Sequence, residues 1–204
     1  MEQKSSKSLQ KLSELHRQHR GLINIMPLQT GGMLTEAAKK ALIEFGDGYS
    51  VCDFCLGSLC DITNPPVREF VHELLPQFLG CEVATLTYGA RDGIFMVMHS
   101  LAKPGDSIVV DGNRHYTTVV AAERAGLNVI EVASSGYPEF RIDVNDYIPL
   151  IEKHTPKLIL LTYPDGNYGN IPNAKRLGDI AQEYDIPYIV NGAYAVGRMP
   201  VSMR

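Results

Sequence analysis

The regular alternation of strand-like and helix-like segments after residue 80 is the feature that most constrains the fold of this chain. Short apolar runs typical of strands occur near 83–87, 107–110, 128–132, 157–162 and 187–190. Helix-like segments fall between them, at 92–102, 116–125, 145–154 and 173–184. Strands that alternate with helices of about ten or more residues are joined by right-handed crossovers into a parallel sheet. The sequence therefore predicts an α/β fold in which helices flank a mainly parallel sheet.

The segment before this alternation divides into two parts of different character. Residues 1–20 form a predicted basic helical arm, with Leu9, Leu12 and Leu15 on one face and five Lys or Arg against two Glu overall. This arm is either a terminal helix that docks through its leucines or a helix that binds a partner. Residues 21–63 are rich in glycine and are expected to wrap around an active site, and residues 64–204 are expected to form the main domain.

Two further helices are predicted at the ends of the wrapping segment. Thr35 is a candidate N-cap for a helix over 36–45, because its hydroxyl can accept a hydrogen bond from the first helical turn. A second helix is expected to start at Asn64, with prolines in its first turn, and to run towards Leu79 with a bend near Pro76.

The overall composition excludes some classes of protein. With 204 residues, 45% of them apolar and 21% charged, the chain is long enough to bury a core. No apolar run is long enough for a membrane span, and the start lacks the features of a signal peptide, so a cytoplasmic location is expected. A net charge of −4 argues against a broadly basic surface, so an RNA partner would have to be held by a local patch such as the arm.

Polar residues gather where the predicted strands end, which is where parallel sheets bind ligands. The turn at 88–93 contains two glycines and opens a helix, so its free N–H groups form a possible anion site. His115 follows the second strand, Asn167 lies in the turn after the fourth, and Asn191 comes directly after the last. Each signal is weak alone, since such turns are common, but their order and spacing together are specific.

Four sequence blocks carry a resemblance to a known family: INIMPLQTGG (23–32), GYSVCDFC (48–55), TYGARDGIFMVMH (87–99) and NGAYAVGRMPVSM (191–203). Through them the chain resembles the O-phosphoseryl-tRNA:cysteinyl-tRNA synthase family of archaeal enzymes, over nearly all of its length after residue 20. That family depends on pyridoxal 5'-phosphate (PLP) and has the aspartate-aminotransferase fold, PLP-dependent transferase fold type I. The resemblance implies that residues 64–204 form part of the large, PLP-binding domain.

The resemblance also implies roles for five residues at the strand ends. The backbone around Ala90 and Arg91 would hold the cofactor phosphate, and His115 would stack on the pyridine ring. Asn167 would bond the ring hydroxyl, and Asn191 would face the ring nitrogen. An aspartate is usual at that last position and keeps the ring protonated, which an asparagine cannot do.

Cys52 and Cys55 match family cysteines that carry sulfur as a persulfide or bind an iron–sulfur cluster, so they are the candidate catalytic thiols. The alternatives are a zinc site, for which a second cysteine pair is missing, and two inert buried thiols. No other metal site is predicted.

The activity implied is conversion of O-phosphoseryl-tRNA(Cys) to cysteinyl-tRNA(Cys), by β-elimination of phosphate and addition of sulfur. The implied partners are tRNA(Cys) carrying phosphoserine, a second copy of the chain in a homodimer, and O-phosphoseryl-tRNA synthetase, without a membrane. The family's Schiff-base lysine lies beyond the last residue of this chain, so the isolated chain is expected to be inactive. Two other interpretations remain: a PLP enzyme of the cysteine desulfurase or selenocysteine synthase type, and a non-catalytic truncated relative that acts as a binding module.

Overall fold

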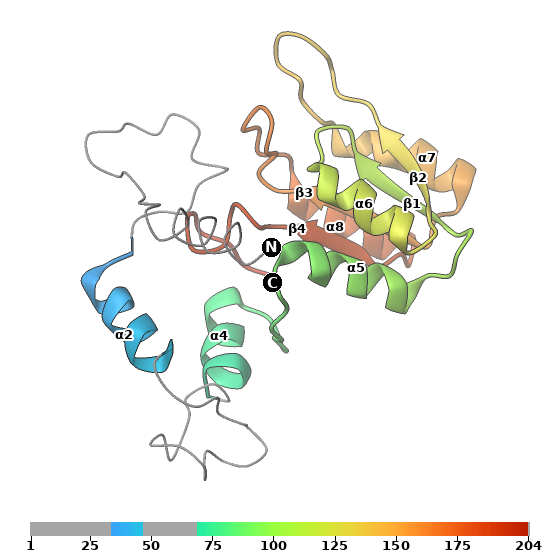
Figure 1. The fold of residues 1–204 in the computed structure, drawn as a ribbon. Helices are drawn as coiled ribbons and strands as arrows, with labels where there is room; N and C mark the ends of the chain where they lie inside the picture. The colour runs from blue at the N-terminus through green and yellow to red at the C-terminus, as the bar shows by residue number, and fades with distance from the viewer. Residues whose placement is uncertain (1–33, 47–68, 204) are drawn as a thin grey trace, which may run out of the picture. The chain divides into compact units, whose positions relative to one another are not determined.

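A sheet of four parallel strands forms the centre of the computed structural model, which describes residues 34–46 and 69–203. The strands are β1 (Ser107–Asp111), β2 (Asn128–Val132), β3 (Leu158–Thr162) and β4 (Tyr188–Asn191), in the spatial order β2-β1-β3-β4 (Figure 1). All three pairings are parallel. The carboxyl ends of the strands therefore meet at one edge of the sheet, as the sequence predicted.

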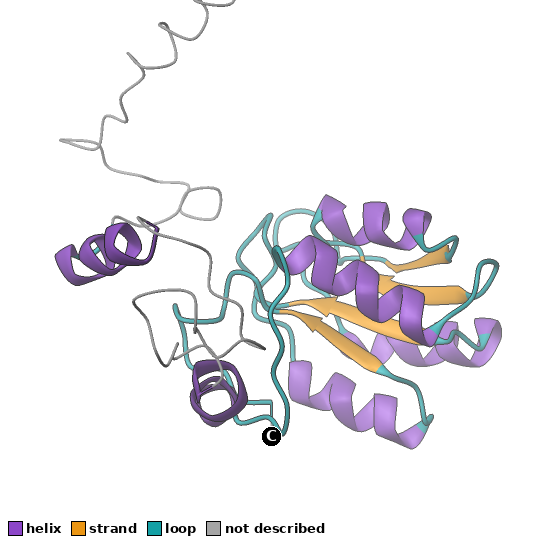
Figure 2. Ribbon diagram, turned by 60° about the horizontal axis from the view of Figure 1, so that its bottom comes forward, coloured by secondary structure: helices purple, strands orange, loops and turns teal. Residues whose placement is uncertain are grey.

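Helices cover both faces of this sheet (Figure 2). On one face α5 (Ala90–Leu101) and α6 (Tyr116–Arg124) pack on alternate strand residues such as Ile108 and Leu160. On the other, α7 (Tyr147–His154) and α8 (Ala174–Glu183) pack on the intervening ones, such as Val109 and Ile159. Burying each of these large aliphatic side chains contributes roughly 1.5–3 kcal/mol. A strand buried on both faces reads as a continuous apolar run, which is the pattern that predicted β1 and β3.

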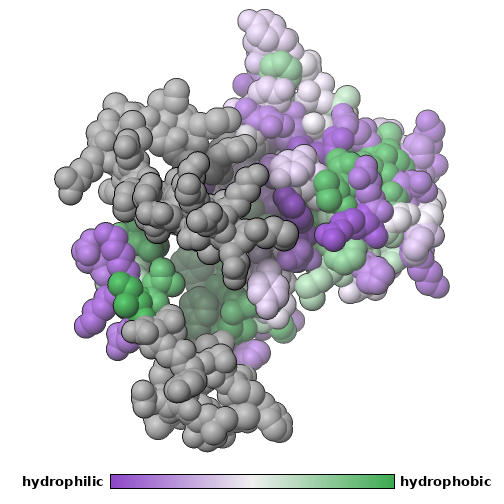
Figure 3. All heavy atoms as spheres, viewed as in Figure 1, coloured by the Kyte–Doolittle hydropathy of each residue, from purple (hydrophilic) through white to green (hydrophobic). Residues whose placement is uncertain are grey.

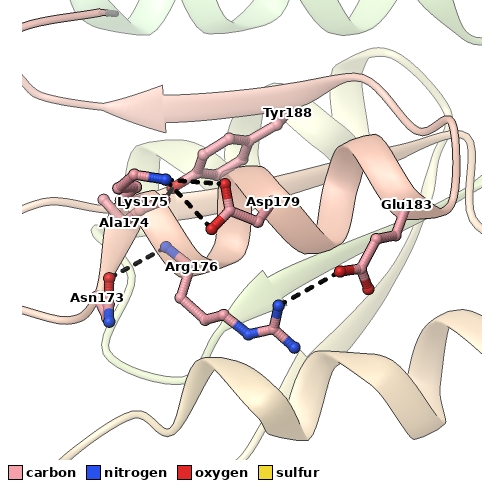
Figure 4. Close-up of polar contacts among 7 residues, drawn as sticks. All are labelled: Asn173, Ala174, Lys175, Arg176, Asp179, Glu183 and Tyr188. Carbon is pink, nitrogen blue, oxygen red and sulfur yellow. Dashed lines mark hydrogen bonds and ion pairs between the residues drawn. The ribbon is translucent and has the colours of Figure 1, made fainter.

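Helix α8 illustrates how the sequence determines where a helix begins and which face it buries (Figure 4). Asn173 caps it, since its side-chain oxygen accepts the N–H of Arg176 at 3.0 Å. Lys175 and Asp179 form an ion pair one turn apart, at 3.1 Å. The apolar residues of the same helix are buried against the sheet: Leu177, Ile180 and Ala181. The remaining predicted helices after residue 90 also lie within about two residues of their expected bounds, with a short 3-10 turn, η3 (Val144–Asp146), preceding α7.

The strand predicted over 83–87 is wrong. This segment has no regular secondary structure and pairs with no strand within the described residues, and Val83 and Leu86 are 79% and 58% exposed. A strand is defined by hydrogen bonds to a neighbouring strand, and no described strand forms such bonds with this segment. The strand-like composition of this segment therefore did not predict a position in the described sheet.

The helix predicted to end near Leu79 is present, with the expected irregularity around Pro76. It consists of a π-helical turn, η2 (Phe70–Leu74), followed by α4 (Leu75–Leu79), and the Leu75 N–H bonds the Phe70 carbonyl. Proline has no N–H to continue a regular helical ladder, which accounts for the change in winding next to Pro76. The predicted start at Asn64 and the arm at 1–20 lie outside the described residues.

Helix α2 (Glu36–Gly46) confirms the helix predicted over 36–45. The Ala38 N–H donates to the Thr35 hydroxyl at 3.2 Å, so Thr35 caps the helix. Across the two described ranges, every helix is too short or too polar to traverse a lipid bilayer.

Candidate functional site

The turn that opens α5 is an uncapped helix start. Gly89 has φ 130° and ψ 169°, a backbone region that only glycine adopts readily, and a Cβ placed on it would meet open space. Within the described residues no side chain caps the helix, and the N–H groups of Ala90 and Arg91 have no acceptor. Unpaired N–H groups at a helix N-terminus attract anions. The turn thus has the donors that a phosphate group needs.

Arg91 brings a positive charge to the same turn. Its Nη2 donates to the Tyr116 hydroxyl at 2.6 Å, and its guanidinium lies 5.4 Å from the centre of the Tyr116 ring. Tyr116 is the first residue of α6, so this contact joins the starts of two helices. Both side chains are exposed, which leaves the guanidinium accessible to an anion in solvent.

His115 is held as the N-cap of α6. Its Nδ1 accepts the Thr117 N–H at 3.4 Å and lies 2.9 Å from the Thr117 hydroxyl. Burial lowers the pKa of His115, and the positive charge of Arg91 lowers it further. Since Nδ1 is the acceptor, the neutral ring carries its proton on Nε2. A fixed, neutral imidazole at the sheet edge is suited to lie against a flat ligand.

Asn167 sits in a loop that is organised by Asp165. The Asn167 N–H donates to Asp165 Oδ1 at 3.0 Å, and the Asn167 Nδ2 donates to the Asn113 carbonyl at 3.2 Å. Asp165 Oδ2 also accepts Asn113 Nδ2 at 3.3 Å. Three more backbone N–H groups donate to the same carboxylate, those of Tyr168, Gly169 and Asn170. The position of Asn167 is therefore set by a buried carboxylate two residues before it.

Asn191 ends β4 and is 6% exposed. Its Oδ1 accepts the Ala193 N–H at 3.4 Å, and its own carbonyl accepts the Tyr163 N–H at 3.0 Å. Within the described residues its Nδ2 has no acceptor. With Oδ1 already engaged, the group that Asn191 offers to a ligand is an N–H donor.

The five predicted cofactor residues lie at the carboxyl edge, and two of them share a pocket. Ala90 and Asn191 line a common pocket of about 600 Å³, formed mainly by apolar residues of α5 and β4. Arg91, His115 and Asn167 lie outside its lining.

Tyr194 links His115 to the loop that carries Asn167. The two rings meet edge to face with their centres 6.2 Å apart. A Cβ on Gly166 would come within 2.9 Å of the Tyr194 ring, so glycine is needed for this loop to approach the tyrosine.

The candidate catalytic thiols, Cys52 and Cys55, lie outside the described residues. Cys81 is described and half-buried, and its thiol donates to the Val83 carbonyl at 3.3 Å. The described ranges contain no group of three or more His, Cys, Asp or Glu side chains arranged to hold a metal ion.

Sequence reasoning missed the residues that hold the site in place, above all Asp165, Asn113 and Tyr194. A signal existed for Asp165, because an Asp at the start of a turn commonly accepts the N–H two residues on. For Asn113 and Tyr194 the contacts join segments more than fifty and more than seventy residues apart, and no local pattern reports them.

Comparison with known proteins gives matches over most of the chain. Residues 56–202 match the sequence model of the family described as O-phosphoseryl-tRNA(Sec) selenium transferase, SepSecS. The O-phospho-L-seryl-tRNA:Cys-tRNA synthase of Methanosarcina acetivorans is 56% identical over 203 residues, covering 97% of this chain and 53% of the relative. That of Methanocaldococcus jannaschii is 49% identical over 189 residues, covering 90% and 50%. The chain thus spans about half the length of the curated relatives it matches.

Solved structures match as well. A crystal structure of a SepCysS–SepCysE N-terminal domain complex superimposes with a TM-score of 0.82 and 47% identity, covering 95% of this chain and 52% of the other. Ureidoglycine-glyoxylate aminotransferase from Bacillus subtilis superimposes with a TM-score of 0.62 and 21% identity, covering 79% and 41%. A mutant of Thermus thermophilus aspartate aminotransferase gives a TM-score of 0.58 and 22% identity, covering 76% and 42%. The last two matches show the fold alone, which is that of the PLP-dependent aminotransferases, as predicted.

Proposed function

Because this chain belongs to the O-phosphoseryl-tRNA(Sec) selenium transferase (SepSecS) family, we propose that it is the N-terminal part of a PLP enzyme that converts O-phosphoseryl-tRNA(Cys) to cysteinyl-tRNA(Cys). The names and identities of its relatives support this reaction over the other reactions of the aminotransferase fold. In this proposal residues 64–204 belong to the PLP-binding large domain, residues 21–63 wrap the active site, and residues 1–20 form a basic arm.

The observation that carries the proposal is the uncapped turn at Gly89. PLP bears a phosphate, and this turn offers the N–H groups of Ala90 and Arg91 together with the Arg91 guanidinium. The open space beside Gly89 leaves the backbone accessible to a bulky anion. These features fit the phosphate of the cofactor without rearrangement of the turn.

The other three residues fit the ring of the cofactor. His115, neutral at pH 7 because its pKa is lowered, would lie against the pyridine face. Asn167 would bond the ring hydroxyl, and Asn191 would donate its free Nδ2 proton to the ring nitrogen. A donor at this position requires the ring nitrogen to be an acceptor, and therefore unprotonated. When bound, PLP supplies an electron sink for the carbon from which the α-proton is removed.

The residues of this chain would thus bind and orient the cofactor, and an unprotonated ring is a weaker electron sink than a protonated one. A weaker sink is consistent with the proposed reaction, because phosphate leaves readily from the β-carbon once the α-proton has gone. Cys52 and Cys55 are proposed to carry the incoming sulfur, through an iron–sulfur cluster or as a persulfide. A persulfide would be loaded by a donor whose sulfur is already at the sulfane level, and a thiol reductant would supply the two electrons that release the product as a thiol.

The proposed assembly is a cytoplasmic homodimer that works on tRNA(Cys) charged by O-phosphoseryl-tRNA synthetase. Support for a partner protein comes from the relative solved in complex with a SepCysE N-terminal domain. Support for RNA comes from the substrate in the relatives' names and from the basic residues of the arm.

The experiment that tests the function is a conversion assay with the complete gene product. O-phosphoseryl-tRNA(Cys) is incubated with the protein, PLP and sulfide, and the amino acid released from the tRNA is identified. Cysteine is the expected product. Release of unchanged phosphoserine by a preparation that binds both PLP and tRNA would overturn the proposal and leave a binding module.

A substitution at Gly89 tests the cofactor site separately from turnover. Gly89→Ala places a side chain in a glycine-only conformation at a cost of about 1–3 kcal/mol. The free turn should relax to relieve this strain, and PLP binding would have to restore the original conformation, so affinity for PLP should fall roughly 5- to 150-fold. Gly105→Ala is the matched control, because Gly105 also has a positive φ of 93° and open space beside it but lies in the turn before β1. Equilibrium dialysis measures the affinity. Equal losses in both variants would remove the turn from the cofactor site.

Asn191→Asp tests the state of the ring nitrogen. An aspartate carboxylate would accept a hydrogen bond from the ring N–H and so favour the protonated ring, and therefore the absorption spectrum of the bound cofactor should shift and turnover should change. An unchanged spectrum and unchanged turnover would show that Asn191 does not face the ring nitrogen.

A further inference from the structure

Three aromatic rings gather on the two loops that leave the carboxyl ends of β2 and β3. The Phe140 and Tyr168 rings are stacked, with their centres 4.1 Å apart and their planes 6° from parallel. The Tyr137 ring meets Phe140 edge to face at 6.3 Å. We call Tyr137, Phe140 and Tyr168 the aromatic platform.

The platform is exposed and does not belong to the core. Tyr137 is 87% exposed and Tyr168 is 52% exposed. In Figure 1 the loop after β2 rises beyond the end of the sheet, and in Figure 3 it projects at the top of the molecule, where pale residues surround a green, hydrophobic one. Neither of the two clusters of buried residues that form the core includes any of these rings. Flat apolar faces in water are the usual mark of a binding surface.

The loops hold the platform in a fixed shape through two side-chain amides, of which that of Asn113 is buried. Phe140 has φ 48°, an unfavourable value for an aromatic residue. Its carbonyl accepts the Asn113 Nδ2 at 2.6 Å and the Asn170 Nδ2 at 3.1 Å, which compensate this conformation. The Tyr168 N–H is held by Asp165 Oδ1 at 2.6 Å. Strained residues that the surroundings hold in place are typical of functional surfaces.

The residues that hold the platform in place also connect it to the candidate cofactor site. Asp165 and Asn113 also fix Asn167, which directly precedes Tyr168. A ligand that stacks on the Tyr168 ring would therefore lie next to Asn167 of the candidate cofactor site. Arg141, which follows Phe140, is exposed and forms no ion pair within the described residues, so it can meet a phosphate beside a stacked base.

From this geometry we infer that the aromatic platform stacks an unpaired nucleobase of the RNA whose aminoacyl end enters the neighbouring cofactor site. The inference rests on the proposed function, because it takes the substrate to be an aminoacylated tRNA. An amino acid on tRNA is attached to a single-stranded 3' end, so its bases are unpaired and can stack. Proteins recognise single-stranded RNA chiefly by stacking its bases on exposed aromatic side chains. A parallel pair of rings at the ligand edge offers such a surface.

The test uses the complete gene product with PLP bound and two RNA hairpins that copy the acceptor stem. One hairpin ends in the single-stranded 3' extension, with 2-aminopurine in place of an unpaired adenine, and the other is blunt. Affinity is measured by fluorescence titration for the first and by competition for the second. The variants are Tyr168→Ala and Tyr137→Ala, with Tyr168→Phe and Tyr137→Phe as controls that keep the rings. Ile171→Ala removes an exposed apolar side chain near the platform without removing a ring.

Loss of the Tyr168 ring should weaken binding of the extended hairpin roughly 5- to 150-fold and leave the blunt hairpin unchanged. The two phenylalanine variants and Ile171→Ala should bind both hairpins like the unaltered protein. Loss of the 2-aminopurine fluorescence change in Tyr168→Ala, but not in Tyr168→Phe, would identify the stacked base directly.

Equal affinities of the alanine variants and the unaltered protein for the extended hairpin would overturn the inference. So would equal losses for both hairpins, because these would indicate a collapsed loop. If the alanine variants bind RNA normally but lose a protein partner, the platform is a protein-binding surface and the inference is again wrong. Ring-dependent RNA binding without cysteine formation would support the platform and refute the proposed function, so the two can fail independently.

Discussion

Two buried aspartates at the same edge of the sheet differ in how many hydrogen-bond donors reach their carboxylates. Asp165, which is 2% exposed, accepts hydrogen bonds from four backbone N–H groups and from the Asn113 side chain. Asp111, at the end of β1, is 1% exposed and receives one strong donor, the Thr162 N–H at 2.8 Å on Oδ2. Its Oδ1 has no partner within the described residues.

This difference shows that burial alone does not determine whether a carboxylate stabilises or destabilises the folded state. A carboxylate surrounded by N–H donors organises the backbone around it, because each donor would otherwise be left without an acceptor. A carboxylate buried with too few donors retains its proton more strongly, and burial raises the pKa of Asp111 to about 6, against the opposing effect of the Thr162 N–H. Asp165 therefore stabilises a loop, while Asp111 costs stability whenever it is ionised.

Removal of the satisfied carboxylate should have the largest effect. Asp165→Ala leaves four backbone N–H groups and the Asn113 amide without their acceptor, so the free energy of unfolding should fall by about 4 kcal/mol. Asp165→Asn keeps the shape and one acceptor oxygen, and should lose about half as much. Urea unfolding of the complete gene product measures both changes. A loss below about 1 kcal/mol for Asp165→Ala would mean that the loop does not depend on this carboxylate.

Replacement of the Asp111 carboxylate should instead raise the free energy of unfolding, by an amount that depends on pH. The pKa of Asp111 is about 6 in the folded protein against 3.8 ordinarily, so the folded state binds the proton more tightly than the unfolded state. The stabilising effect of that proton is complete below the ordinary pKa and is lost as the pH rises through 6. Asp111→Asn removes this loss, so above pH 6 it should be more stable than the unaltered protein by up to about 3 kcal/mol.

The pH series itself provides the control for this prediction. Urea unfolding at about pH 8 and about pH 4 should show the difference between Asp111→Asn and the unaltered protein shrinking towards zero in acid. A difference that is the same at both pH values would contradict the raised pKa. A loss of stability in the variant at high pH would show that the ionised carboxylate is compensated after all.

The contrast between these aspartates also shows which features of the structure could be predicted from the sequence alone. The buried strands and amphipathic helices were predictable, since Ile108 to Val110 and Leu158 to Leu161 are apolar on both faces and turn residues separate them from the helices. The position of each polar residue at the strand ends followed from that topology. Four donors to Asp165 are backbone N–H groups within five residues of it. The Asn113 donor to Asp165 and the Thr162 donor to Asp111 are about fifty residues away, so they depend on which segments meet in the fold.

The segment 83–87 was mispredicted for the same reason. Its residues have strand-like composition, but pairing depends on a neighbouring strand that local sequence does not specify. The roles of Ala90, Arg91, His115, Asn167 and Asn191 stay predictions, because their chemistry depends on a cofactor and not on the fold alone.

Two adjacent threonines on α6 differ in the same way, because only one of their hydroxyls has a hydrogen-bond partner within the described residues. The Thr117 hydroxyl lies 2.9 Å from Nδ1 of His115, whereas the buried Thr118 hydroxyl has no partner within the described residues. Valine keeps nearly the same shape in both cases, and its helix propensity differs little from that of threonine. Thr118→Val should raise the free energy of unfolding by up to about 1 kcal/mol, because it removes a hydroxyl that was desolvated without compensation.

Thr117→Val should lower the free energy of unfolding by about 1 kcal/mol, because it leaves His115 Nδ1 with only the longer bond from the Thr117 N–H. Thermal unfolding of the two variants side by side measures both changes in the same helix and at neighbouring positions. Opposite signs would show that partnership, and not burial, sets the cost of each hydroxyl at this edge of the sheet. If both variants shift in the same direction, the fit of valine in α6 dominates, and the comparison of the two aspartates would need another explanation than donor supply.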